Sequence, residues 1–358
     1  MKSVVSKKAF TVVELMVAMA LIAILMALSS LIFATAVRAH RTADSTLEIT
    51  RRAEAICRQL SADFRGLQKD GEIFLVWVAS PALNKDGVQI APLQYQKFDR
   101  IVFFADGDFQ TYNPQPTRAA GVTKPLTGNL ARISYVPAKD GNSVRAAYQP
   151  DRKKRILSRT QHLVTADSDF LDFPDFSAAW DPDDFERKNF FDYEYQTMTM
   201  AEWTNLSNPA HPNVAAKNNI LTILSDIQNI LFVDGSVIEG GPTVDSQDSD
   251  TYHNYFCEGV GEFGIQIWLK NQQRWFPQLD PDQDGNYTDS DYPTVGSVIH
   301  PSQVDGVLYD GTGEGNLKTA YNGISLEFTA LKFTFTVHDT KGLFPDGRTF
   351  THIVMIED

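Results

Sequence analysis

The amino-acid sequence predicts an α+β protein, in which one long N-terminal helix packs on antiparallel β-sheets that carry long loop insertions. Three observations support this fold class. An uncharged apolar run of 23 residues separates Glu14 from Arg38. A helical pattern with a single apolar face follows that run, and alternation of apolar and polar residues begins at about residue 72. The chain of 358 residues is 43% hydrophobic and 22% charged, which is the composition of a folded protein.

The apolar run is long enough to cross a bilayer as a helix, which takes about 20 residues. Lys2, Lys7 and Lys8 precede the run and favour a cytoplasmic N-terminus, so the chain after about residue 38 is expected outside the cytoplasm. A secretory signal has a shorter apolar core with a small-residue cleavage site after it, and no such site is evident here. The sequence therefore predicts a single-pass membrane protein with an external head.

Glu14 is the one charge at the start of this apolar run. A carboxylate in such a place is costly unless it lies near the interface or pairs with a cation. A cut between Ala9 and Phe10 would create an α-amine four residues before Glu14. Glu14 could then pair with such an amine on a neighbouring subunit.

The segment K-K-A-F-T-V-V-E-L-M-V-A resembles the N-terminal signal of type IV pilins and type II secretion pseudopilins. The resemblance implies that a prepilin peptidase removes residues 1–9 as a leader, cutting between Ala9 and Phe10, and that Phe10 is then methylated. It also implies that Glu14 sets the register of assembly. Ala9 departs from the family, which usually has Gly there. The implied fold is pilin-like, the precursor lies in the inner membrane, and the partners are other pilins or pseudopilins.

The helix is expected to continue well beyond the membrane, over about residues 11–67. Within the segment 10–67 we expect a transmembrane part at about 12–37 and a stalk at 38–67, with the head formed by 68–358. One apolar stripe marks the side of the stalk that packs on the head. It consists of Ile49, Ala53, Ile56, Leu60, Phe64 and Leu67.

The head is expected to consist mainly of strands, because short segments rich in β-branched and aromatic residues recur along it. These segments are 73–79, 100–105, 131–136, 262–270, 324–328, 331–339 and 350–356. Apolar spacing predicts one internal helix at 219–232. Polar stretches rich in Gly, Pro and Asp predict loops at 106–130, 137–155, 165–192 and 234–256.

This order of elements is similar to that of the larger minor pseudopilins of the J type and of PilW-like minor pilins. The similarity is carried by residues 130–135, 265–275 and 331–356. It implies a minor pseudopilin of a type II secretion pseudopilus, located at or near the tip. Two alternatives stay open: a minor pilin of a type IV pilus that serves adhesion or DNA uptake, and a membrane-anchored, calcium-dependent extracellular enzyme.

The charge distribution bears on these alternatives. Residues 1–65 hold nine basic and five acidic residues, whereas the remainder holds 23 basic and 40 acidic residues. An acidic head disfavours nucleic acid, whose phosphates need a basic surface. No catalytic motif stands out, so we do not expect an enzyme. The acidic and aromatic stretch at 169–195, most of it in the predicted loop 165–192, is either a partner surface or an insertion that packs on the sheet.

A calcium site is predicted in the segment DPDQDGNYTDSD, residues 280–291. Asp280, Asp282 and Asp284 stand at positions 1, 3 and 5 of a calcium loop, Asn286 stands at position 7, and Asp291 stands at position 12. This spacing wraps oxygen atoms around one Ca²⁺ ion. Position 12 holds Asp instead of Glu, and the flanks do not look helical. The alternative is a solvated turn.

The two cysteines, Cys57 and Cys257, are too few for a disulfide framework. A head outside the cytoplasm permits one bridge between them. The alternative is two unpaired, mostly buried thiols.

Overall fold

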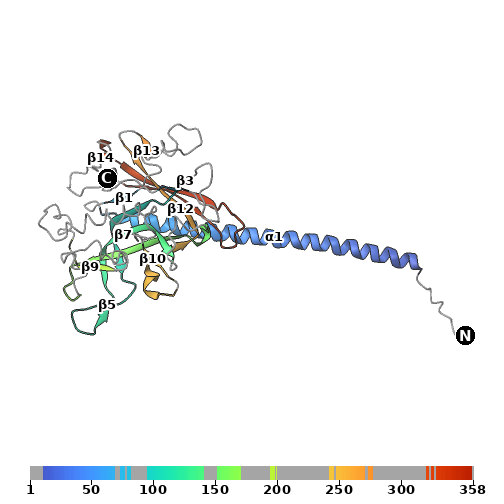
Figure 1. Ribbon diagram of the computed structural model, residues 1–358, viewed down its shortest axis with the longest axis horizontal. Helices are drawn as coiled ribbons and strands as arrows, with labels where there is room; N and C mark the ends of the chain where they lie inside the picture. Colours follow the sequence, from blue (N-terminus) through green and yellow to red (C-terminus); the bar gives the residue numbers. More distant parts are fainter. Residues whose placement is uncertain are drawn as a thin grey trace, which may run out of the picture.

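The computed structural model describes residues 11–68, 73–76, 79–81, 95–140, 151–170, 194–197, 199, 242–245, 247–270, 273–276, 320–321, 324–325 and 328–356. Helix α1 (Val12–Arg65) leaves the head as a single rod, and only its C-terminal half lies against the strands (Figure 1). The α+β class is confirmed. The predicted helix at 219–232 lies outside the described residues.

Helix α1 begins and ends where local chemistry sets its limits. Its 54 residues contain neither Gly nor Pro, so nothing interrupts a rod of about 80 Å. Thr11 is the N-cap and Gly66 is the C-cap. The Gly66 carbonyl accepts a hydrogen bond from Asp106 N at 2.6 Å, and a Cβ on Gly66 would collide with the Asp106 carbonyl oxygen. Gly66 therefore permits the chain to pass close to the sheet.

Seven strands form the larger sheet. Its main path runs β1-β4-β7-β8-β11, with antiparallel neighbours throughout, while β9 pairs parallel with β8 and β10 pairs parallel with β7. These strands are β1 (Phe74–Val76), β4 (Arg100–Gln110), β7 (Thr127–Asp140), β8 (Ile156–Thr165), β9 (Tyr195–Thr197), β10 (Thr243–Val244) and β11 (Tyr255–Glu258).

The second sheet has four antiparallel strands in the order β13-β12-β16-β17. They are β13 (Arg274–Phe276), β12 (Val260–Leu269), β16 (Phe328–Val337) and β17 (Arg348–Met355). Three small pairs join β2 (Ala79–Pro81) to β3 (Tyr95–Lys97), β5 (Gln115–Pro116) to β6 (Thr123–Lys124), and β14 (Ala320–Tyr321) to β15 (Ile324–Ser325). The described residues also contain the short 3-10 helices η1 (Arg152–Lys154) and η4 (Ser249–Asn254).

Several segments that we predicted to be loops contain strands, and those predictions were wrong in part. Within 106–130, β4 continues to Gln110, β5 and β6 pair, and β7 starts at Thr127. Within 137–155, β7 continues to Asp140 and η1 forms at 152–154. Within 234–256, β10, η4 and the start of β11 occur. Pairing with a neighbouring strand overrides the polar composition of these segments.

The stalk stripe packs between the two sheets. Ile49, Ala53, Ile56, Leu60 and Phe64 are buried, as predicted, and Leu67 is partly buried. The Phe64 ring stacks on Phe103 of β4 with centroids 4.1 Å apart and lies 5.5 Å from Phe333 of β16. The helix therefore belongs to the same hydrophobic core as both sheets.

A buried ion pair lies near the end of the stripe. Asp63 is 5% exposed, and its two carboxylate oxygens each accept a hydrogen bond from Arg159 of β8 at 2.7 Å. Tyr135 of β7 donates its hydroxyl to Asp63 at 2.5 Å, and Gln59 donates to Asp63 at 2.9 Å. Burial, followed by the Asp63 charge, raises the pKa of Tyr135 well above its usual value, so the hydroxyl keeps its proton. These bonds fix α1 against β7 and β8.

A second set of contacts holds α1 at the other end of the head. Arg52 donates to the carbonyl oxygens of Glu258, at 2.9 Å, and His338, at 3.3 Å. Glu48 accepts a hydrogen bond from the Thr340 hydroxyl at 3.0 Å. The Lys341 ammonium lies 3.5 Å from Asp44. The segment that follows β16 is therefore held along α1.

His338, at the start of that segment, is 1% exposed. The ring hydrogen-bonds to the Pro345 backbone, whereas its Nε2 has no partner in the described part of the chain. Burial is the largest cause that lowers the pKa of His338, to about 4, and the charges of Arg152 and Arg155 lower it further. The imidazole is therefore neutral at ordinary pH.

We expect Asp63→Ala to lower the free energy of unfolding by about 3–5 kcal/mol, because it leaves the Arg159 charge buried without its partner. Denaturant titration of the detergent-solubilised chain, followed by near-ultraviolet circular dichroism, measures this change. The control is Glu54→Ala, which breaks an exposed pair with Arg58 and should cost less than about 0.5 kcal/mol. Equal small losses in the two variants would contradict the role of Asp63.

We expect stability to fall as the pH drops from about 6.5 towards about 4. Over that window the unfolded chain binds a proton on His338 and the folded chain does not, which favours unfolding by up to about 3 kcal/mol. The slope of unfolding free energy against pH should flatten in His338→Gln relative to the unsubstituted chain. An unchanged slope in His338→Gln would contradict this assignment.

Candidate functional site

The N-terminal turn of α1 holds Glu14 in a capping box. The Glu14 carboxylate accepts hydrogen bonds from the backbone N–H and the hydroxyl of Thr11, both at 3.0 Å. In return, Glu14 N donates to the Thr11 hydroxyl at 3.3 Å. The sequence analysis did not assign Thr11, although the pattern T-x-x-E before an apolar run is the signature of this motif. Within a single chain, Thr11 therefore supplies the hydrogen bonds that an isolated carboxylate needs.

The apolar part of α1 has no cover from the head. Each large apolar side chain from Val12 to Phe33 is at least 52% exposed. The helix is long and apolar enough to cross a membrane, and none of its most apolar stretch is buried in the structure. Exposure of this extent in water is strongly unfavourable. The segment therefore requires either lipid or the helices of other subunits around it.

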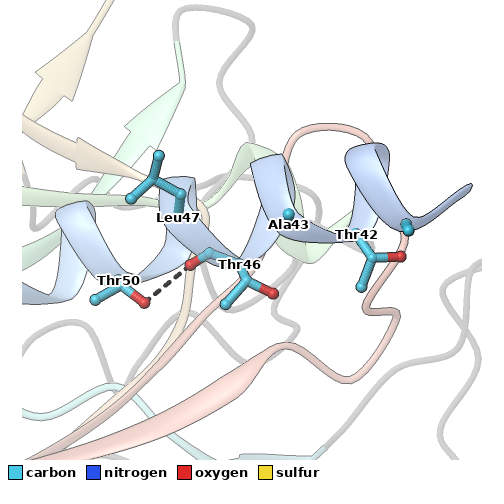
Figure 2. Close-up of a pocket in the computed structure, with 6 residues that line it drawn as sticks. Thr42, Ala43, Thr46, Leu47 and Thr50 are labelled. Carbon is cyan, nitrogen blue, oxygen red and sulfur yellow. Dashed lines mark hydrogen bonds between the residues drawn. The ribbon is translucent and has the colours of Figure 1, made fainter. Parts of the chain in front are cut away.

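Where α1 leaves the head, residues 39–50 present a shallow open groove (Figure 2). Thr42 and Thr50 donate their hydroxyls to the carbonyls of Arg38 and Thr46 on their own helix, at 3.0 and 2.9 Å. Their polar atoms are therefore already satisfied. Ala and Thr side chains line most of this face, together with Leu47. The lining residues are Ala39, Thr42, Ala43, Thr46, Leu47 and Thr50.

The processing site and the calcium loop are not in the described part of the chain. Ala9 and Phe10 precede Thr11, and Asp280, Asp282, Asp284, Asn286 and Asp291 all lie in 277–319. Most of the stretch 165–192 also lies outside, from residue 171 onward. Among the described residues, no group of three or more His, Cys, Asp or Glu side chains could hold a metal ion.

Both cysteines are free thiols in the structure. Cys257 is buried in the core, and Cys57 is partly buried against the same core. Burial raises the pKa of both thiols, that of Cys257 to about 11. A raised pKa keeps both thiols protonated at ordinary pH.

Comparison with known proteins identifies the N-terminal segment. Residues 5–30 match the family model described as the prokaryotic N-terminal methylation motif. No curated protein and no solved structure matches the chain. The matched segment contains Ala9, Phe10, Thr11 and Glu14 together with most of the uncovered apolar helix. This motif supports a type IV pilin-like protein with a structural role, membrane association and assembly with other pilins.

Proposed function

We propose that the chain is a minor pseudopilin of a type II secretion pseudopilus, at or near the tip. The observation that carries the proposal is Glu14, an acid at the start of an uncovered apolar helix and inside the matched methylation motif. In a membrane anchor this carboxylate serves only to cap the start of the helix, whereas in a helical assembly it can also pair with a neighbour's N-terminal amine.

The proposed mechanism has two stages. First, α1 anchors the precursor, and prepilin peptidase cuts between Ala9 and Phe10, after which Phe10 is methylated. Second, the helix leaves the lipid and packs against sister helices in the filament. Glu14 then exchanges hydrogen bonds with Thr11 for a bond to an adjacent amine. A subunit in the wrong register would leave the charge unpaired, and this cost opposes misassembly.

Two features outside the membrane segment support the proposal, one on the stalk and one in the head. The groove at 39–50 lies on the stalk outside the core, and its Ala and Thr side chains allow another helix to approach beside the exposed Leu47. The head has a bulk of nearly 300 residues in the sequence, which would crowd a regular filament if every subunit carried it. This bulk favours few copies and a position at the tip.

A minor pilin of a type IV pilus is the second candidate, because the methylation motif is common to pilins and pseudopilins. The acidic composition after residue 65 disfavours a role in DNA uptake. Adjacent genes for a secretion channel and sister pseudopilins would support the first candidate, whereas genes for pilus retraction would support the second.

We expect Glu14→Ala to insert into the membrane normally but to be lost from filaments and from co-purification with sister pilins. Thr11→Val is the matched control, since it removes both hydrogen bonds that the Thr11 hydroxyl makes with Glu14 and keeps the charge. Mass spectrometry of the native protein should find N-methylated Phe10 as the first residue. Incorporation of Glu14→Ala at the wild-type level would contradict the register role, and an uncut Met1 would contradict processing.

We further propose that residues 280–291 bind Ca²⁺ through Asp280, Asp282, Asp284, the Asn286 carbonyl and Asp291. Binding to the folded state alone raises stability by mass action, so the unfolding temperature of the full chain should be higher in Ca²⁺ than in chelator. Asp282→Ala combined with Asp284→Ala should abolish the difference. Asp245→Ala combined with Asp248→Ala, in another acidic segment, should keep it. A calcium response that survives the first pair of changes would exclude this loop.

A further inference from the structure

The loop between β16 and β17, residues 338–347, lies at the end of the head from which α1 emerges. We refer to it as the base loop. Its contacts move step by step along α1 towards the apolar segment. The His338 carbonyl is bound by Arg52, Thr340 is bound to Glu48, and Lys341 reaches Asp44. Eight helical residues separate the first and last contacts on α1, which corresponds to about 12 Å. Figure 1 shows this C-terminal region, in red, alongside α1 where the helix leaves the head.

Cations gather around the base loop. The Lys341 side chain is 48% exposed, Lys154 of η1 is exposed, and the Lys153 ammonium lies against Gly342. Arg38 and Arg41 are exposed on the adjoining turns of α1. The nearby acids are partly engaged: Asp44 lies 3.5 Å from Lys341 and Glu48 lies 3.0 Å from Arg52, while Asp151 and Asp346 are exposed. With the buried Asp339 of the base loop included, six cations, Arg52 among them, face five acids. This is a small positive excess in a sequence that is strongly acidic after residue 65.

The base loop also exposes an apolar side chain. Leu343 is 43% exposed, although its backbone is fixed because its N–H donates to the Asp339 carboxylate at 2.9 Å. Phe344 N donates to the same carboxylate at 3.0 Å. An exposed Leu beside lysines, on a loop with a fixed backbone, has the mixed character of a surface that contacts a membrane interface.

The distance from the bilayer fits such a contact. The uncharged run ends at Val37, and Asp44, the helical partner of Lys341, follows seven residues later, which corresponds to about 10 Å. The polar headgroup layer extends about 5–7 Å beyond the hydrocarbon core. A flexible lysine side chain spans the remaining distance between Asp44 and the headgroup layer. Electrostatic attraction acts over about 8–10 Å at physiological ionic strength.

We propose that the base loop, together with Lys153 and Lys154, binds the phosphate groups of anionic lipids while the chain is anchored in the membrane. The inference rests on the proposed function, because it requires α1 to span the bilayer. A lipid surface is favoured over an acidic protein because the cations are continuous with the membrane segment of the same chain. The contact holds the head against the bilayer before assembly. Because it is made by exposed charges, it is easily broken when the subunit leaves for the filament.

Lysine acetylation of the full chain in nanodiscs tests the proposal, with the modification of each lysine quantified by mass spectrometry. One set of discs contains phosphatidylcholine only, and the other also contains phosphatidylglycerol. We expect Lys341 and Lys153 to be acetylated several-fold less in the anionic discs and to regain reactivity in high salt. Lys270 is the internal control, because it is exposed and follows the end of β12 opposite to the Arg52 contact. Its acetylation should be the same in both discs.

Variants sharpen the test. In Lys341→Gln combined with Lys153→Gln, protection of Lys154 should no longer depend on the lipid, whereas Lys270→Gln should leave that dependence intact. Equal acetylation of Lys341 in the two lipids, with the chain still in the discs, would overturn this proposal and leave the proposed function standing. A chain that fails to enter the discs would instead contradict the membrane anchor itself. Protection that appears only after sister pilins are added would identify a protein as the occupant and overturn the lipid assignment.

Discussion

The bond between Asp63 on α1 and Arg159 on β8 determines how the rest of the molecule is arranged. Both groups are largely buried, and burial by itself lowers the pKa of the arginine, but the hydrogen bonds and charge of Asp63 outweigh this effect and raise it. An apolar stripe alone tolerates small slides of a helix along a sheet. The bidentate pair of Asp63 with Arg159, to which Tyr135 adds a hydroxyl hydrogen bond, does not tolerate such slides. Any slide would leave buried charges without their hydrogen-bond partners. The head is therefore locked to one position along α1.

Helix α1 serves two environments within one continuous element. From Ile49 onward its buried side chains belong to the core of the head, whereas from Val12 to Phe33 its apolar side chains have no protein cover. The section between them carries the groove at 39–50 and the contacts to the base loop. The same rod therefore presents, in order, a segment for lipid or sister helices, a face open to neighbours, and a face committed to its own head.

Sequence patterns were sufficient where one physical requirement dominated. The buried stripe of α1 follows from a single apolar face, and the burial of Ile49, Ile56 and Leu60 confirms it. Strand β8 was missed because its buried positions include Ser158, Thr160 and His162, which hide the usual apolar signal. The ion pair was missed for a similar reason, since Asp63 and Arg159 look like surface residues until the sheet brings them together. The importance of Glu14 was predicted because a carboxylate at the start of an apolar run can be recognised from the sequence alone. Its hydrogen bonds with Thr11 were missed because they depend on the residue at which the helix begins.

The absence of Gly and Pro from Val12 to Arg65 has a mechanical consequence. A helix without a hinge resists twisting as well as bending, and Arg52 and Asp63 attach it to strands near both ends of its buried portion. A torque applied to the apolar N-terminal segment is consequently transmitted to the head through a rigid helix. If such a subunit rotates as it leaves a bilayer, its head must rotate by the same angle as the helix.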